Sequence, residues 1–338
     1  MSADDQRRDG MYMIGQVAAL RKNVCHIADL HAEVSTGSTA LLRTLAPPPR
    51  PHAIRSAPSA TPARVAIVGM GCLLPQAPDI RTLWSNILNR RDAITEIPAD
   101  RFDANRYFST DRRARDRFYS KWGGFLEEVA FDPIKYGIPP GAVPSIDPFQ
   151  LLTLEVVYQA LGDAGYSDRP FNRERTSVIL GASGGVGDLG FHYGIRAGLP
   201  MYFDHVSEET LARLPEWTED SFAGVLLNVA AGRVANRLDL GGLNFTVDAA
   251  CASSLAAIFL AARELETGSS DMAIVGGIDT VNSPSGYLCF SSAQALSPRG
   301  RCSTFDDSAD GIAISEGLVA LVLKRLPDAE RDGDRIYA

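Results

Sequence analysis

The sequence contains few cysteines, and none of them is paired at a spacing typical of a metal site. Its five cysteines are an odd number, lack any Cys-x-x-Cys pair, and stand at Cys25, Cys72, Cys251, Cys289 and Cys302. Disulfide-held secreted domains need an even set of cysteines, and structural zinc sites need closely spaced ones. No cluster of histidines and carboxylates suggests a metal either. We therefore expect a cytoplasmic protein with neither a disulfide framework nor a metal site.

The sequence also lacks a long hydrophobic run and an excess of basic residues. The longest stretch without charged or bulky polar groups is residues 249–262, which is shorter than the ~18–20 residues needed to span a bilayer. Arg21 and Lys22 interrupt the only apolar stretch near the N-terminus, so no signal peptide is visible. The net charge is −8, whereas nucleic-acid binders need basic surfaces. We expect a soluble protein without membrane or nucleic-acid partners.

Composition predicts three parts along the chain. Residues 1–45 contain a heptad pattern of mostly apolar positions: Met13, Val17, Leu20, Val24, Ile27, His31 and Val34. This pattern is typical of a parallel two-stranded coiled coil, so residues 11–45 are a candidate segment for dimerisation or for docking to a partner. The alternative is a single amphipathic helix on a surface. Residues 46–63 are rich in proline, alanine and serine, which predicts a linker, and the main domain covers residues 64–338.

Within the main domain, short apolar runs alternate with helical patterns. We expect strands at residues 65–68, 178–180, 244–247, 272–275 and 318–323, and helices at residues 83–88, 150–164, 222–238 and 253–265. Alternation of strands and helices, with glycine after several strands, predicts α/β layers around a buried sheet that is at least partly parallel.

Two glycine-rich segments partly match motifs of other protein classes. Gly69-Met70-Gly71 follows an expected strand, but Leu74 stands where the dinucleotide-binding fingerprint requires a third glycine. We interpret it as a tight strand exit and expect no bound cofactor. Residues 181–185 match the GxSxG motif of hydrolases, with Ser183 as the serine. That motif needs a histidine far downstream, and the last histidine is His205, so a flexible loop is the preferred interpretation and an esterase is the alternative.

Cys251 stands between an expected strand and an expected helix. After the strand at residues 244–247, the turn Asp248-Ala249-Ala250 leads to Cys251, and the following helix has no polar residue from Leu255 until Arg263. We therefore expect that helix to be buried on all sides. Unpaired amides at a helix N-terminus favour negative charge, and the thiolate is the nucleophilic form of cysteine. Cys251 is the candidate nucleophile, and a buried structural cysteine is the alternative.

The segment Val247-Asp248-Ala249-Ala250-Cys251-Ala252-Ser253-Ser254-Leu255 closely resembles the active-site motif of ketoacyl synthases, which have the thiolase fold. Flanking segments resemble the same family in order and spacing: residues 64–71, 121–126, 147–150, 163–166, 231–233, 305–311 and 316–317. The resemblance covers residues 64–338 and is strongest to type I synthases of polyketides or polyunsaturated fatty acids. It implies a thiolase-like α/β/α fold of which the chain holds the N-terminal half, preceded by the helical extension and the linker.

The resemblance also implies a reaction. A ketoacyl synthase transfers an acyl group from the phosphopantetheine of an acyl carrier protein to its cysteine, here Cys251. It then condenses that group with a carrier-bound malonyl unit, and no cofactor is bound directly. In the family, two histidines from the second half of the domain promote the decarboxylation, and this sequence has no histidine after His205. We therefore expect an acyltransferase that is incomplete as a 338-residue chain, working as a homodimer. The alternative is a non-catalytic docking or dimerisation module, in which residues 11–45 recruit an upstream synthase partner.

Other conspicuous residues have ordinary interpretations. We expect Cys72, Cys289 and Cys302 to be packing residues and the five histidines to be solvated. The basic run at residues 112–117 is interleaved with aspartates, which is typical of a solvated loop. Docking of an acidic carrier protein on this run is the alternative.

Overall fold

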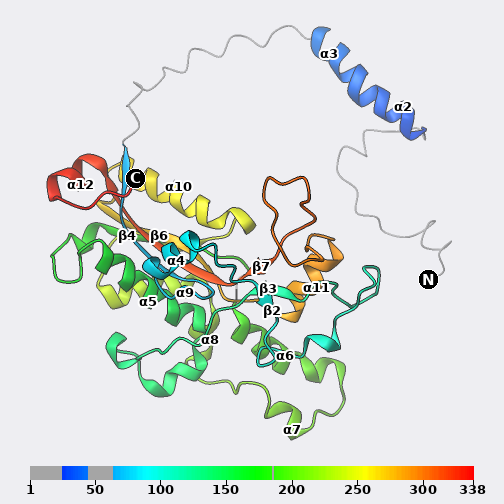
Figure 1. Ribbon diagram of the computed structural model, residues 1–338, viewed down its shortest axis with the longest axis horizontal. Helices are drawn as coiled ribbons and strands as arrows, with labels where there is room; N and C mark the ends of the chain where they lie inside the picture. The colour runs from blue at the N-terminus through cyan, green and yellow to red at the C-terminus, as the bar shows by residue number, and fades with distance from the viewer. Residues whose placement is uncertain (1–24, 45–63, 185) are drawn as a thin grey trace. The chain divides into compact units, whose positions relative to one another are not determined.

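The computed structural model describes residues 25–44, 64–184 and 186–338 (Figure 1). The chain divides into two units, residues 1–60 and 61–338, and each is described by itself. In the first unit, helix α2 (Ile27–Ala32), a π-helical turn (Glu33–Gly37) and helix α3 (Ser38–Thr44) follow one another without a break. Apolar side chains of this helical segment are exposed: Leu30, Val34, Leu41 and Leu42. The predicted linker and the heptad positions before residue 25 lie outside the described residues, and dimerisation through residues 11–45 stays a prediction.

The second unit is built on a five-stranded sheet with the strand order β1-β8-β6-β4-β5. The strands are β1 (Val65–Leu73), β4 (Thr176–Gly181), β5 (Asn244–Val247), β6 (Met272–Asp279) and β8 (Gly317–Arg325). Strand β8 is antiparallel to both β1 and β6, whereas β4 is parallel to both β5 and β6. The structure confirms all five predicted strands and the expectation of a partly parallel sheet.

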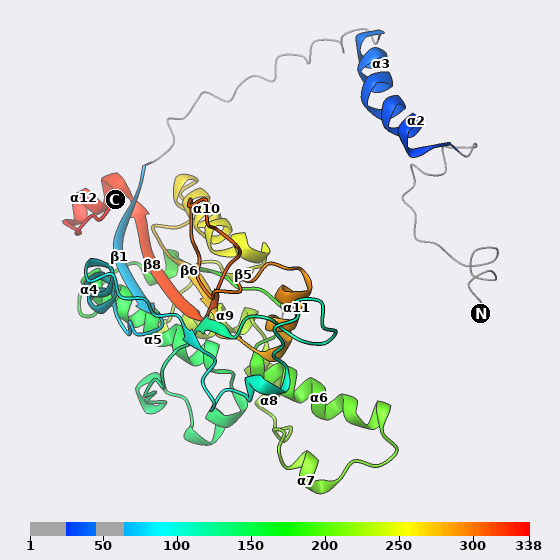
Figure 2. The same ribbon diagram turned by 45° about the vertical axis from the view of Figure 1, so that its right-hand side comes forward.

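Helices cover both faces of this sheet (Figure 2). Helices α5 (Pro148–Asp163) and α9 (Asn228–Leu238) pack on one face, and α10 (Ser253–Glu266) packs on the other. Strand β4 shows why two faces are needed, because its side chains alternate. Val178 and Leu180 join the core under α5 and α9, and Ile179 joins the core under α10. The predicted layered α/β/α arrangement is confirmed.

The predicted strand exit at Gly69 and Gly71 is wrong, because both glycines lie inside β1. A Cβ atom at Gly69 would stand 2.4 Å from the carbonyl oxygen of Ala160, and one at Gly71 would stand 2.4 Å from that of Val156. Both carbonyls belong to α5. The glycines therefore allow the backbone of α5 to approach the strand more closely than any side chain would permit.

The remaining elements surround this three-layer core. They are α4 (Ile80–Leu88), α6 (Asp188–Tyr202), α7 (Glu208–Leu211), α8 (Ser221–Val225), α11 (Pro284–Ser292), α12 (Leu326–Asp332) and a small sheet of β2 (Thr95–Glu96), β3 (Trp122–Gly124) and β7 (Ile314–Ser315). None of the helices in the described ranges combines the length and apolar character needed to cross a bilayer.

The single helix predicted over residues 222–238 is instead two helices, α8 and α9. The chain is extended at Leu226, which ends α8. The side-chain amide of Gln150 on α5 donates to the carbonyls of Ala223, Gly224 and Leu226 over 2.9–3.0 Å. This buried amide supplies hydrogen bonds to carbonyls at the end of α8.

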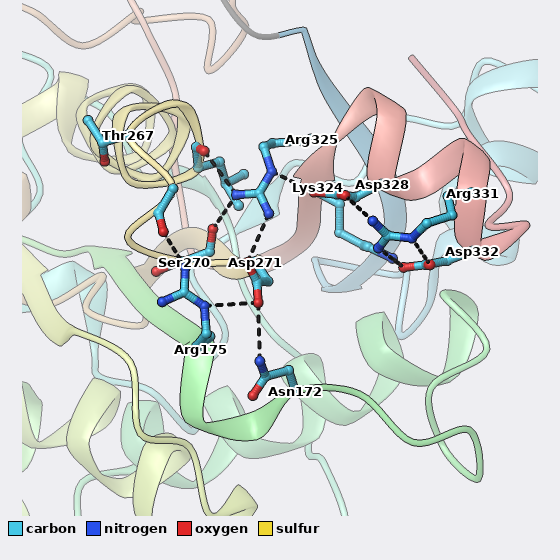
Figure 3. A network of polar contacts seen from close by, with 12 residues as sticks. Asn172, Arg175, Thr267, Ser270, Asp271, Lys324, Arg325, Asp328, Arg331 and Asp332 are labelled. Carbon is cyan, nitrogen blue, oxygen red and sulfur yellow. Dashed lines mark hydrogen bonds and ion pairs between the residues drawn. The ribbon is translucent and has the colours of Figure 1, made fainter.

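A network of polar contacts joins the ends of β6 and β8 to α12 (Figure 3). The guanidinium group of Arg325 donates to the carboxylate of Asp271 at 2.9 Å and to the carbonyl of Ser270 at 2.7 Å. Arg175, which immediately precedes β4, donates to the same carboxylate at 3.0 Å. Arg325 also pairs with Asp328 on α12. The network thus links three strands and one helix at the end of the sheet where β4 and β6 begin.

Lys324 is a buried charged residue near this network, with only 4% of its surface exposed. Its Nζ atom lies 2.5 Å from the carboxylate of Asp332, 2.6 Å from that of Asp334 and 2.8 Å from the hydroxyl of Tyr166. Burial acts to lower the pKa of Lys324, but the hydrogen bonds with these partners outweigh it and raise the pKa. The ammonium group is therefore charged in the folded protein.

The ion pairs of this cluster should make the folded protein less stable in acid. Hydrogen bonds from Arg331 and then Lys324 lower the pKa of Asp332 to about 2, below the value of about 3.9 for an unfolded chain. A lowered folded-state pKa means that the carboxylate stabilises the fold above pH of about 4 and loses this contribution as the pH falls to about 2. We expect the free energy of unfolding to fall more steeply in this window for the wild type than for Asp332→Asn, as measured by urea denaturation. Parallel pH profiles would contradict this account.

Candidate active site

Cys251 lies in a short 3₁₀ turn (Ala250–Ala252) between β5 and α10. Its side chain is exposed. The sequence predicted the strand and the helix correctly, but it placed the turn at residues 248–250, before Cys251, whereas the 3₁₀ turn of the structure includes Cys251. Ala250 has φ +49°, in the left-handed region that L-residues rarely adopt. The chain therefore bends sharply just before the thiol.

Hydrogen bonds from two sides hold this turn. The carboxylate of Asp248 accepts from the Ala250 amide at 2.9 Å, from the Ser183 hydroxyl at 3.0 Å and from the Gly184 amide at 3.3 Å. On the other side, the Ser253 hydroxyl donates to the Ala250 carbonyl at 2.6 Å and accepts from the Ala249 amide at 2.9 Å. The hydrogen bond from Ala250, followed by those from Ser183 and Gly184, keeps the pKa of Asp248 below its usual range. Asp248 is therefore a carboxylate at neutral pH.

Two glycines bring the start of α10 against the ends of the central strands. A Cβ atom at Gly181, the last residue of β4, would stand 2.4 Å from the carbonyl carbon of Ser253. A Cβ atom at Gly277 in β6 would stand 2.8 Å from the Cβ atom of Ser254. Both positions need glycine for this close approach. Gly181 in the GxSxG segment thus permits packing rather than forming a hydrolase turn.

A cavity of about 550 Å³ opens beside the thiol. It is lined by Cys251 together with Leu74, Ser183, Ile258, Ile278, Glu316 and Leu321, among others. Most of these residues stand at the edge of the sheet where β4 and β6 end and β8 begins. The cavity combines apolar walls with a few polar groups, as sites for small organic ligands commonly do.

Glu316 is a buried carboxyl group in the wall of this cavity, and the sequence did not single it out as a site residue. Arg101 forms an ion pair with it at 3.0 Å, and the amide of Leu126 donates to it at 2.9 Å. Burial raises the pKa of Glu316 despite these partners. Nothing local in the sequence links it to Arg101, because 215 positions separate the two residues.

No histidine among the described residues lines the cavity of Cys251. His192 lies on α6 with its side chain 45% exposed and 3.5 Å from Asp188, and His205 is exposed. None of the described histidines therefore stands beside Ser183 as a base, and the Ser183 hydroxyl donates to Asp248. This arrangement does not form the triad that the esterase alternative requires.

Two expectations about burial are wrong. Helix α10 is not buried on all sides, because Leu255 is 69% exposed and Phe259 is 62% exposed, although Ala257 and Ala261 are fully buried. Cys72 is a buried packing residue as predicted, whereas Cys289 and Cys302 are exposed. The arginines of the basic run at residues 112–117 are exposed, as expected for a solvated loop.

Comparison with known proteins agrees with this geometry. The family model described as beta-ketoacyl synthase, N-terminal domain, matches residues 63–329. The chain therefore belongs to the beta-ketoacyl synthase family, and its fold is the thiolase-like fold of ketosynthase domains.

Its relatives include synthases that are much longer than this chain. The chain is 37% identical over 277 residues to the polyketide synthase PksN of Bacillus subtilis, covering 82% of this chain and 5% of that protein. It is 36% identical over 287 residues to a polyunsaturated fatty acid synthase of Thraustochytrium, covering 81% of this chain and 10% of that one.

Solved ketosynthase structures match as well. The oxazolomycin ketosynthase domain OzmH KS7 of Streptomyces albus is 33% identical with a TM-score of 0.67, covering 80% of this chain and 44% of that chain. The ketosynthase from module 6 of the bacillaene synthase of Bacillus subtilis is 34% identical with a TM-score of 0.63, covering 81% and 42%. The chain thus spans less than half the length of these structures.

Proposed function

We propose that these 338 residues carry the acylation half of a ketosynthase, with Cys251 as the nucleophile that accepts the acyl group. The observation that carries this proposal is the exposed thiol on a sharply bent turn, opening into a mostly apolar cavity of about 550 Å³. The chain belongs to the beta-ketoacyl synthase family. The sequence of the turn resembles the active-site motif of that family.

In the proposed first step, the Cys251 thiolate attacks the carbonyl carbon of an acyl thioester. The bond from that carbon to the carrier's phosphopantetheine sulfur breaks, the released thiolate takes up a proton, and the acyl group remains on Cys251 as a new thioester. The apolar walls beside Ile258 and Leu321 suit the hydrocarbon part of such a group. No cofactor is needed for this exchange of one thioester for another.

The proposed second step is a decarboxylative Claisen condensation with a carrier-bound malonyl unit. It needs groups that favour loss of carbon dioxide and stabilise the resulting enolate, and the family resemblance assigns this role to two histidines of the second half. We propose that residues outside these 338, on the same or another chain, supply them. The partners are then an acyl carrier protein with acyl or malonyl thioesters and, by family resemblance, a second copy of the chain.

A docking or dimerisation module is the second candidate function. The exposed leucines Leu30, Leu41 and Leu42 on the helical segment before the main unit favour it. In this alternative the synthase fold is inert, and the segment at residues 11–45 recruits a partner. The two functions differ in one measurable property, the uptake of an acyl group.

The test is to incubate the purified chain with a carrier-bound acyl thioester, digest it, and locate the acyl group by mass spectrometry. We expect it on the peptide that contains Cys251. Acylation of Ser183 would instead support the esterase, and an unlabelled chain would support the docking module.

Adding malonyl carrier should yield no condensation product from the 338 residues alone. A normal rate of condensation without another polypeptide would contradict the proposed division of the two steps.

A further inference from the structure

Asp248 and Ser183 have no part in the proposed thioester exchange, yet both contact the turn that carries the nucleophile. Ser183 also belongs to the GxSxG segment, which the proposed function leaves unexplained. We propose that the Asp248 carboxylate is a positioning residue for Cys251, joining the loop after β4 to the turn after β5 so that the thiol is held at the mouth of the cavity. This inference rests on the proposed function, because it concerns the orientation of the same thiol.

The strand register brings the two segments together. Strands β4 and β5 are parallel, and Gly181 is paired with Val247 at their common end. Ser183 and Asp248 therefore leave the sheet at the same edge, as residues beyond the carboxyl ends of neighbouring parallel strands do. Their side chains meet at 3.0 Å. A contact between residues 65 positions apart is thus set by backbone pairing and does not depend on local sequence.

The conformation of Ala250 explains why the turn needs such support. The left-handed backbone is unfavourable for an L-residue, so it persists only where the surrounding contacts enforce it. Asp248 accepts from the amide of Ala250, and Ser253 donates to its carbonyl. Both polar groups of this residue are therefore bonded to side chains on either side of the bend. Loss of one contact should let Ala250 relax and move the next residue, Cys251.

A carboxylate suits this position better than an amide of the same shape. Asp248 receives three hydrogen bonds, from the Ala250 amide, the Ser183 hydroxyl and the Gly184 amide, with the third on its second oxygen. Both of its oxygens are acceptors, whereas asparagine has one acceptor oxygen and an amino group. In Asp248→Asn that amino group would face the Gly184 amide or the other two donors. We expect the rate of acylation of Asp248→Asn to lie between those of the wild type and Asp248→Ala.

Ser183 has a defined role in this arrangement. Its hydroxyl donates to Asp248, and none of the described histidines lines the cavity, so it acts as a support for the carboxylate and not as a nucleophile. The Ser183 hydroxyl lies closer to Asp248, at 3.0 Å, than to the Ala250 carbonyl at 3.5 Å or the Ser253 hydroxyl at 3.4 Å. Because its main contact is with Asp248, removing both side chains should slow acylation little more than removing the Asp248 side chain alone. Such non-additivity is the signature of residues that act through one shared contact.

The experiment compares acylation of Cys251 from a carrier-bound acyl thioester in the full chain and in its variants. We expect Asp248→Ala to slow acylation about 100-fold, as small displacements of a reacting group do, and Ser183→Ala to slow it about tenfold or less. The Asp248→Ala/Ser183→Ala double variant should match Asp248→Ala. Asp132→Ala is the matched control, because Asp132 also accepts from an amide two residues ahead, at 3.0 Å, but does not line the cavity. It should acylate at the wild-type rate.

Iodoacetamide labelling, mapped by peptide, separates positioning from unfolding. Cys289 and Cys302 are exposed internal references, and Cys72 is buried and should react only if the domain opens. We expect Asp248→Ala to leave these three cysteines unchanged while the labelling of Cys251 relative to Cys302 changes at least about threefold. Reactive Cys72 in this variant would show a merely structural role and overturn the proposal, as would acylation within about twofold of wild type.

The two proposals fail in different ways. If the wild type is not acylated at Cys251, the proposed function fails, and the labelling ratio of Cys251 to Cys302 still decides whether Asp248 positions the thiol. If the wild type is acylated and Asp248→Ala acylates equally well, only the positioning role fails. Additive effects of the Asp248 and Ser183 substitutions would overturn the part assigned to Ser183.

Discussion

Replacing Cys251 by alanine should abolish transfer of an acyl group to the chain, lowering the rate by at least about 10⁴-fold, as removal of a nucleophile does in other enzymes. The reason is that the reaction needs a sulfur at this position, and Cys251 is the cysteine that lines the cavity. The measurement is intact-protein mass spectrometry over time after addition of the carrier-bound acyl thioester.

Cys302→Ala is the matched control for this experiment. Cys302 is also exposed and lies outside the cavity lining, so its loss should leave acylation unchanged. Persistent acylation of Cys251→Ala would show that the group resides elsewhere and would remove the basis of the proposed function. Loss of acylation in the Cys302 variant alone would point to that thiol instead.

The second large effect concerns stability. Lys324→Ala should lower the free energy of unfolding by about 3–5 kcal/mol, the cost of removing one partner from a buried ion pair. The side chain of Asp334 is fully buried, and without Lys324 its partners among the described residues are the partly exposed Arg169 and the Tyr166 hydroxyl. Urea denaturation at neutral pH measures the difference.

Arg331→Ala is the control for this prediction because Arg331 contacts the same Asp332 carboxylate from the surface. Its side chain is 67% exposed, and exposed ion pairs contribute little to stability. We expect its loss to change the unfolding free energy far less than the loss of Lys324. If the two substitutions lowered the unfolding free energy equally, burial would not be the reason that the Lys324 ion pair stabilises the fold.

Strands β4 and β6 were predictable because burial on both faces selects runs of apolar residues. Residues 178–180 and 272–275 are examples, and the structure extends each strand by only a few residues. The break between α8 and α9 was not predictable, since it depends on the amide of Gln150, more than seventy positions earlier. The exposure of Leu255 and Phe259 was also missed. An apolar helix sequence does not reveal which of its faces other parts of the chain cover.

The candidate site was predictable only in part. Cys251 was found because the strand, turn and helix around it are continuous in the sequence and resemble a known motif. The contact between Ser183 and Asp248 was not, because it follows from the register of β4 and β5 and not from spacing along the chain. The pairing of Arg101 with Glu316 was missed because 215 positions separate the two residues.

Strand β6 connects two regions with separate tasks. One end adjoins Asp271, which Arg175 and Arg325 hold in place, and the other end reaches Asp279 in the cavity wall. At about 3.3 Å per residue, roughly 26 Å of extended backbone separates them. Substitutions so far apart should combine additively. The end at Asp271 could therefore be changed to raise thermal stability, and the end at Asp279 could be changed to accept other acyl groups, independently of each other.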